Sequence, residues 1–157
     1  MGKINMQKVL IGGLIAGVVL NIVDYVLYGV VLKAQMAAAM QALGKPPIAG
    51  NTILWFVFLD FVVGVFLVWL YAAIRPRYGA GPATAVKAGL AAWFLGGLVN
   101  AAFMWPMGLM PHNLTVISTA VMLVEFPLAA AVGAKFYMEG AGMGAGMGAG
   151  AGMGARM

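Results

Sequence analysis

Four long apolar runs dominate this chain and restrict what it can fold into. They lie at residues 9–31, 53–74, 88–107 and 114–137. Each has the roughly 20 residues that a helix needs to cross the hydrocarbon core of a bilayer at a rise of about 1.5 Å per residue. Hydrophobic side chains make up 64% of the 157 residues, charged side chains make up 8%, and the mean hydropathy is +0.99. This composition argues against a soluble core.

These runs predict an all-α fold, because a helix satisfies its own backbone hydrogen bonds where no water is available. We expect a polytopic membrane protein with four transmembrane helices arranged as two antiparallel hairpins. The first run follows basic residues, as a signal peptide does. It is longer than a signal core and is interrupted by Asn21 and Asp24, so we keep it as a spanning helix. Residues 1–139 would form the transmembrane domain, and the Gly/Ala/Met-rich, low-complexity residues 140–157 would form a flexible cytoplasmic tail.

Basic residues divide unevenly between the two sides of such a bundle. If the N-terminus is cytoplasmic, the outer side receives only Lys33 and Lys45. The cytoplasmic side then receives Lys3, Lys8, Arg75, Arg77, Lys87, Lys135 and Arg156. Because cytoplasmic loops carry the excess of Lys and Arg, we expect both termini to be cytoplasmic. The formal net charge of +5 then reflects topology, and the scattered cations predict the lipid bilayer, not a nucleic acid, as the partner.

Three of the four acidic residues lie inside the apolar runs, and two Asn side chains lie at similar depth. Ionisable groups in lipid are costly, so they tend to face a protein interior or a watery cavity. Helical geometry places both Asn residues about 20 Å from the basic residues that precede their runs, near the bilayer centre. The sequence therefore predicts a polar layer near the midplane, made of Asn21, Asp24, Asp60, Asn100 and Glu125.

Two interpretations of this layer stay open. Without a neighbouring cation, the carboxyl groups would be protonated, share protons, bind a cation or reach water, which suits a small proton- or cation-coupled carrier. Alternatively, protonated Asp60 and Glu125 would hydrogen-bond Asn100 and Asn21 and hold the helices together. Small residues share helix faces with these polar groups, as at packing interfaces between membrane helices. We therefore expect a non-enzymatic accessory or assembly subunit that packs against other membrane subunits or against itself, with the carrier as the alternative.

A recurring spacing indicates a parallel internal repeat, with chance recurrence in a Gly- and Val-rich background as the alternative. A Lys precedes a Gly by nine residues and an Asn by thirteen in two of the runs. The two sets are Lys8, Gly17, Asn21 and Lys87, Gly96, Asn100. The remaining two runs each contain an acid followed by Phe, at Asp60 and at Glu125.

No cofactor is identified by the sequence. His112, the only histidine, lies at the outer boundary and could ligate a haem or a chlorophyll axially, or it could be a plain loop residue. Three tail methionines, Met143, Met147 and Met153, could offer thioethers to Cu(I), or they could belong to a plain tail. The chain has no cysteine, and it has no nucleophile–base pair, zinc spacing or nucleotide-binding motif. We therefore expect neither an enzyme nor a metal site.

The connection after the first run has its own pattern. The Ala/Met-rich segment from Lys33 to Leu43 predicts a short helix along the membrane interface, which Gly44 would end before Pro46-Pro47 turns the chain back. The first run ends in Asp24-Tyr-Val-Leu-Tyr-Gly-Val-Val-Leu, and three further runs follow this segment. In this layout, residues 5–138 resemble small four-helix bacterial membrane proteins of uncharacterised families. That resemblance implies a bacterial inner-membrane location and no assigned activity.

Overall fold

The computed structural model describes residues 3–137 of the chain. Helices account for 84% of these residues, and no strand occurs among them. Four helical stretches within this part are long and apolar enough to cross a membrane: Met6–Val31, Asn51–Tyr78, Pro82–Met107 and His112–Ala134. The expected all-α fold with four spans is confirmed, and it is the architecture of a multi-pass membrane protein. The predicted tail, residues 140–157, lies outside the described residues.

The first span consists of two kinds of helix. Helix α1, Met6–Asp24, continues directly into the π-helix η1, Tyr25–Val31. The side chain of Asn5 accepts a hydrogen bond from the backbone N–H of Lys8 at 3.1 Å and so caps the first turn. As expected, a short helix follows, α2 (Lys33–Ala42), and Gly44 lies just past its end with a φ of +64°, a conformation that glycine adopts readily.

The other spans begin earlier than the apolar runs suggest. Helix α3, Asn51–Tyr78, and the third span both extend into polar sequence, because helices do not stop at the edge of the hydrocarbon. The third span starts at Pro82, which suits the first helical position because proline has no N–H to satisfy there. It runs through α4 (Pro82–Trp93), the π-helix η2 (Phe94–Val99), α5 (Asn100–Met104) and the 3₁₀ turn η3 (Trp105–Met107). Helix α6, His112–Ala134, forms the fourth span.

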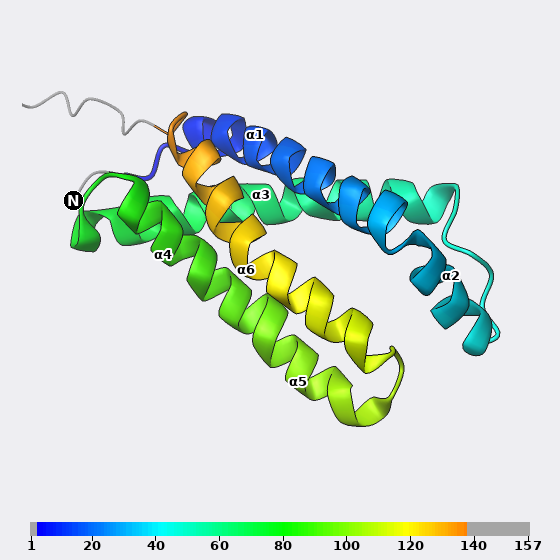
Figure 1. Cartoon of the computed structure of the whole chain (residues 1–157). Helices are drawn as coiled ribbons and strands as arrows, with labels where there is room; N and C mark the ends of the chain where they lie inside the picture. Colours follow the sequence, from blue (N-terminus) through cyan, green and yellow to red (C-terminus); the bar gives the residue numbers. More distant parts are fainter. Residues whose placement is uncertain (1–2, 138–157) are drawn as a thin grey trace, which may run out of the picture.

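The four spans converge at one end of the molecule and diverge toward the other (Figure 1). Helix α1 packs along α3 and also contacts α6, while α4 packs along α6. The main core lies where the helices converge, and its fully buried members include Val9, Ala16, Leu67, Val68, Ala85, Ala88, Ala129 and Ala130. A smaller cluster near the other end joins η1, α2 and the start of α6 through Leu27, Leu32, Ala39 and Leu114.

Glycines allow the backbones of α1, α3 and α6 to touch. A Cβ atom on Gly64 of α3 would overlap the backbone of Gly13 and Gly17 in α1. A Cβ atom on Gly12 would lie 2.5 Å from the carbonyl oxygen of Gly133 in α6. Small residues at helix contacts are the usual means of packing in membranes, where lipid is as apolar as the side chains it replaces. Glycines therefore allow α1 to pack closely against α3 on one face and against α6 on another.

Two tyrosines contact three segments of the chain at the converging end. The backbone N–H of Asn5 donates to the hydroxyl of Tyr137 at 3.4 Å, and that of Gly81 donates to the hydroxyl of Tyr71 at 3.2 Å. The two tyrosine rings meet edge to face at 6.0 Å, and the Arg75 guanidinium lies 5.6 Å from the centre of the Tyr137 ring. The beginning of α1, the α3–α4 connection and the end of α6 therefore share one end of the bundle.

Candidate functional site

The three membrane acids come from three different spans. Asp24 is the last residue of α1, Asp60 lies in α3 and Glu125 lies in α6. Glu125 is only 3% exposed, and the two aspartates are half-buried. The three carboxyl groups are close enough to interact electrostatically with one another. The fold therefore gathers three acids that are far apart in the sequence.

Helix packing explains part of this gathering. A Cβ atom on Gly17 of α1 would lie 2.8 Å from the Cα atom of Phe61, the residue that follows Asp60. This close approach holds Asp60 beside α1, two turns before Asp24. In α6, Glu125 is followed by Phe126 and Ala129, which are both buried in the main core.

Two hydroxyl groups join the acids, although the predicted layer did not include them. Tyr28, in η1, is half-buried and interacts electrostatically with all three carboxyl groups, and its hydroxyl lies within reach of that of Ser118 in α6. Tyr28 follows Asp24 by four residues, and Ser118 precedes Glu125 by seven. These helical spacings are the sequence signal that could have identified both residues.

The hydrogen bonds expected between the acids and the two Asn residues are not formed. The Asn21 side chain donates instead to the backbone oxygens of Gly17 at 2.8 Å and of Val57 at 3.4 Å. No carboxyl group of the three forms a hydrogen bond or an ion pair with any residue in the described range. Asn21 therefore joins α1 to α3 through the backbone, and the acids are not part of that contact.

Asn100 shares no hydrogen bond with the acids. It begins α5 directly after the π-helix η2, its side chain is exposed, and that side chain forms no hydrogen bond with residues 3–137. Seven residues earlier, Trp93 faces inward and its indole N–H donates to the carbonyl oxygen of Thr119 in α6 at 2.8 Å. A π-helix has more residues per turn than an α-helix, so η2 shifts the inward face between these two positions. The prediction of the polar layer treats the third span as one continuous α-helix.

His112 is the first residue of α6 and is exposed. Its ring stacks on Trp105 with ring centres 4.0 Å apart and an angle of 3° between the planes, so one face of the imidazole is covered. Within the described part of the chain, no group of three His, Cys, Asp or Glu residues is arranged to hold a metal ion. Axial ligation by His112 stays a prediction, and the tail methionines lie outside the described residues.

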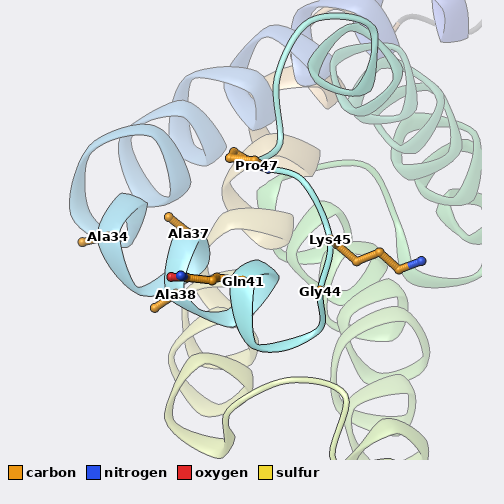
Figure 2. Close-up of a pocket in the computed structure, with 7 residues that line it drawn as sticks. All are labelled: Ala34, Ala37, Ala38, Gln41, Gly44, Lys45 and Pro47. Carbon is orange, nitrogen blue, oxygen red and sulfur yellow. The ribbon is translucent and has the colours of Figure 1, made fainter.

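A hollow of about 700 Å³ lies between α2 and the segment that follows it (Figure 2). Its lining consists of Ala34, Ala37, Ala38, Gln41, Gly44, Lys45 and Pro47. All of these residues are exposed, and the Lys45 side chain extends away from α2. None of the membrane acids lines this hollow, so it is separate from the carboxyl groups.

No protein-family model, no curated protein and no solved structure matches this chain.

Proposed function

We propose that this chain is an accessory or assembly subunit of a membrane, without enzymatic activity, that packs against other membrane helices. The exposed amide of Asn100 carries the proposal. Transfer of an amide from water to cyclohexane, where it forms no hydrogen bond, costs about 4–8 kcal/mol. Asn side chains in membrane helices therefore tend to hydrogen-bond across to a neighbouring helix.

The depth of Asn100 supports this argument. It lies seven residues before the end of the Pro82–Met107 span, which is about 10 Å along the helix axis. The span is longer than the hydrocarbon core of about 30 Å, and this position falls inside the core when the span is centred. Water therefore does not replace the missing partner.

Steric access to this site is also open. Gly96 lies one turn before Asn100 and is exposed, and the nearest heavy atom to a Cβ atom built on it is Phe126 Cε2 at 3.9 Å. A small residue beside a polar one allows the backbone of a partner helix to come close enough for a hydrogen bond.

Affinity purification in a mild detergent, followed by a native gel and mass spectrometry of every band, tests the proposal. The wild-type chain should migrate in an assembly, and Asn100→Leu should migrate in a smaller one. Leu98→Ala changes an exposed residue on another face of the same span and should behave as the wild type. A wild-type chain that migrates alone as a monomer would contradict the proposal.

Further parts of the proposal concern location and arrangement. We place the chain in a bacterial inner membrane with both termini cytoplasmic, because the basic residues cluster in the segments of the converging end. The packing of α1 on α3 and of α4 on α6 supports two antiparallel hairpins. An internal repeat would relate these pairs. Gly17 and Gly96 would be equivalent positions in that repeat, but Gly17 is buried and Gly96 is exposed.

A small proton- or cation-coupled carrier is the second candidate function. The specific observation in its favour is that three carboxyl groups interact with one another inside the bundle without a hydrogen bond. Uptake assays in proteoliposomes distinguish the two candidates. The double variant with Asp60→Asn and Glu125→Gln should abolish transport by a carrier and leave an assembly subunit folded and assembled. If this double variant loses assembly, the acids are part of the assembly function.

A further inference from the structure

We infer that the partner of the exposed Asn100 is Asn100 of a second copy of this chain. The inference deepens the proposed assembly role and rests on it. The surface concerned, the Asn100 face, consists of Gly96, Asn100, Phe103 and Met104, all of which are exposed. Phe103 and Met104 follow Asn100 by three and four residues within α5, so these three residues share one side of the third span. Gly96 precedes them in η2.

The chemistry of the amide favours a copy over an unrelated helix. An Asn side chain carries both an N–H₂ donor group and a carbonyl acceptor, so two Asn side chains satisfy each other with reciprocal hydrogen bonds. In coiled coils, a single Asn that faces its counterpart on the partner helix fixes the register and the number of helices that associate. A partner helix with only aliphatic side chains would leave the Asn100 amide unsatisfied.

Membrane geometry favours the same partner. Two copies inserted with the same orientation can be related by a two-fold axis parallel to the membrane normal. That symmetry puts equivalent residues at equal depth, so the two Asn100 side chains meet whenever their faces meet. An unrelated partner would need a polar residue at this depth and on this side of its helix.

The surroundings of Asn100 suit a close helix crossing. Gly96, in η2 just before Asn100, is exposed and has no side chain that would keep a neighbouring helix at a distance. Phe103 is 71% exposed and lies one turn beyond Asn100, where it would shield the amide pair from lipid.

The absence of native cysteine makes a clean cross-linking experiment available. Phe103→Cys and Met104→Cys place single thiols on the Asn100 face, and Leu98→Cys places one on another exposed side of the same span. Each full-length variant is oxidised in membranes at low expression. We expect disulfide-linked dimers with the first two variants and little dimer with Leu98→Cys, because a disulfide requires Cα atoms within about 7 Å.

The role of the amide is tested in the Phe103→Cys chain. Asn100→Leu should raise the dimer dissociation constant about three- to tenfold, measured by energy transfer between labelled chains over a range of lipid-to-protein ratios. Asn100→Gln keeps the amide and should retain most of the association. Unchanged thermal unfolding of the monomer would show that Asn100→Leu does not disturb the fold.

The possible outcomes separate the inference from the proposed function. Equal cross-linking from Leu98→Cys, or association that Asn100→Leu leaves unchanged, overturns the inference. If the copies do not associate but Asn100→Leu still releases a different subunit from the native assembly, the inference is wrong and the assembly role stands. If neither association exists, both are wrong.

Discussion

Trp93 of α4 and Thr119 of α6 are joined by a hydrogen bond of 2.8 Å, from the indole Nε1–H to the backbone carbonyl oxygen. The indole N–H has no other acceptor among the described residues, and both helices are within the apolar spans. This bond therefore connects the third and fourth spans at the last inward-facing position before the π-helix η2.

Removing this bond should weaken the contact between α4 and α6. We expect Trp93→Phe to lower the free energy of unfolding by about 0.5–1.5 kcal/mol, because the hydrogen bond is lost while most of the apolar surface remains. Unfolding in mixed detergent micelles measures the change. Trp69→Phe is the matched control, since Trp69 is 40% exposed on α3 and should change stability little. Equal losses in the two variants would show that the hydrogen bond does not matter.

The glycine contact between α1 and α3 predicts a larger loss of stability. The Cβ atom of Gly64→Ala would overlap the backbone of Gly13 and Gly17, so the two helices must separate. Overpacking of this kind typically costs about 1–3 kcal/mol. Unfolding of the monomer in detergent should show this loss for Gly64→Ala and none for Gly96→Ala, whose added methyl group would meet only Phe126 Cε2, at an ordinary contact distance of 3.9 Å. A Gly64→Ala protein as stable as the wild type would contradict the packing described for α1 and α3.

Hydropathy was sufficient to predict the four spans, because length and apolar composition alone decide whether a helix can cross a bilayer. The ends of the spans were less predictable. Polar residues such as Arg75, at the end of α3, continue a helix beyond the hydrocarbon, so the apolar runs underestimate the length of the first three spans. Residues that favour helix starts predict where the helices begin better than hydropathy does: Asn5 caps the N-terminus of α1, and Pro82 is the first residue of α4.

The polar layer was harder to predict because it depends on the direction in which each side chain projects from its helix. Counting by the α-helical period places Trp93 and Asn100 on one face, but η2 intervenes and Asn100 becomes exposed. A second π-helix, η1, begins immediately after Asp24 and carries Tyr28 to the acids. A π-helix depends on the packing of neighbouring helices as well as on local sequence. The Gly96-Gly97 pair inside η2 was the available hint of an irregular helix.

The tyrosines at the converging end predict a local effect. Tyr71 is 4% exposed and its hydroxyl accepts from the backbone N–H of Gly81. Tyr71→Phe removes this acceptor, so the α3–α4 connection should open more often and the amide of Gly81 should exchange hydrogen about two- to tenfold faster. Tyr25→Phe, at a residue that is 71% exposed, is the control and should leave this exchange unchanged. Unaltered exchange in Tyr71→Phe would show that the hydroxyl does not hold the connection.

The stack of His112 on Trp105 allows the two roles considered for His112 to be separated. A stacked aromatic pair contributes about 0.5–1.5 kcal/mol, so His112→Ala should speed hydrogen exchange in the connection between the third and fourth spans about two- to tenfold. His112→Phe keeps an aromatic ring over Trp105 but has no nitrogen to bind a metal. If stacking is the role of His112, His112→Phe should exchange like the wild type. If axial ligation is its role, both variants should lose the same absorbance band from protein purified with its native pigment. Exchange in His112→Ala as slow as in the wild type would show that the ring contact with Trp105 does not stabilise this connection.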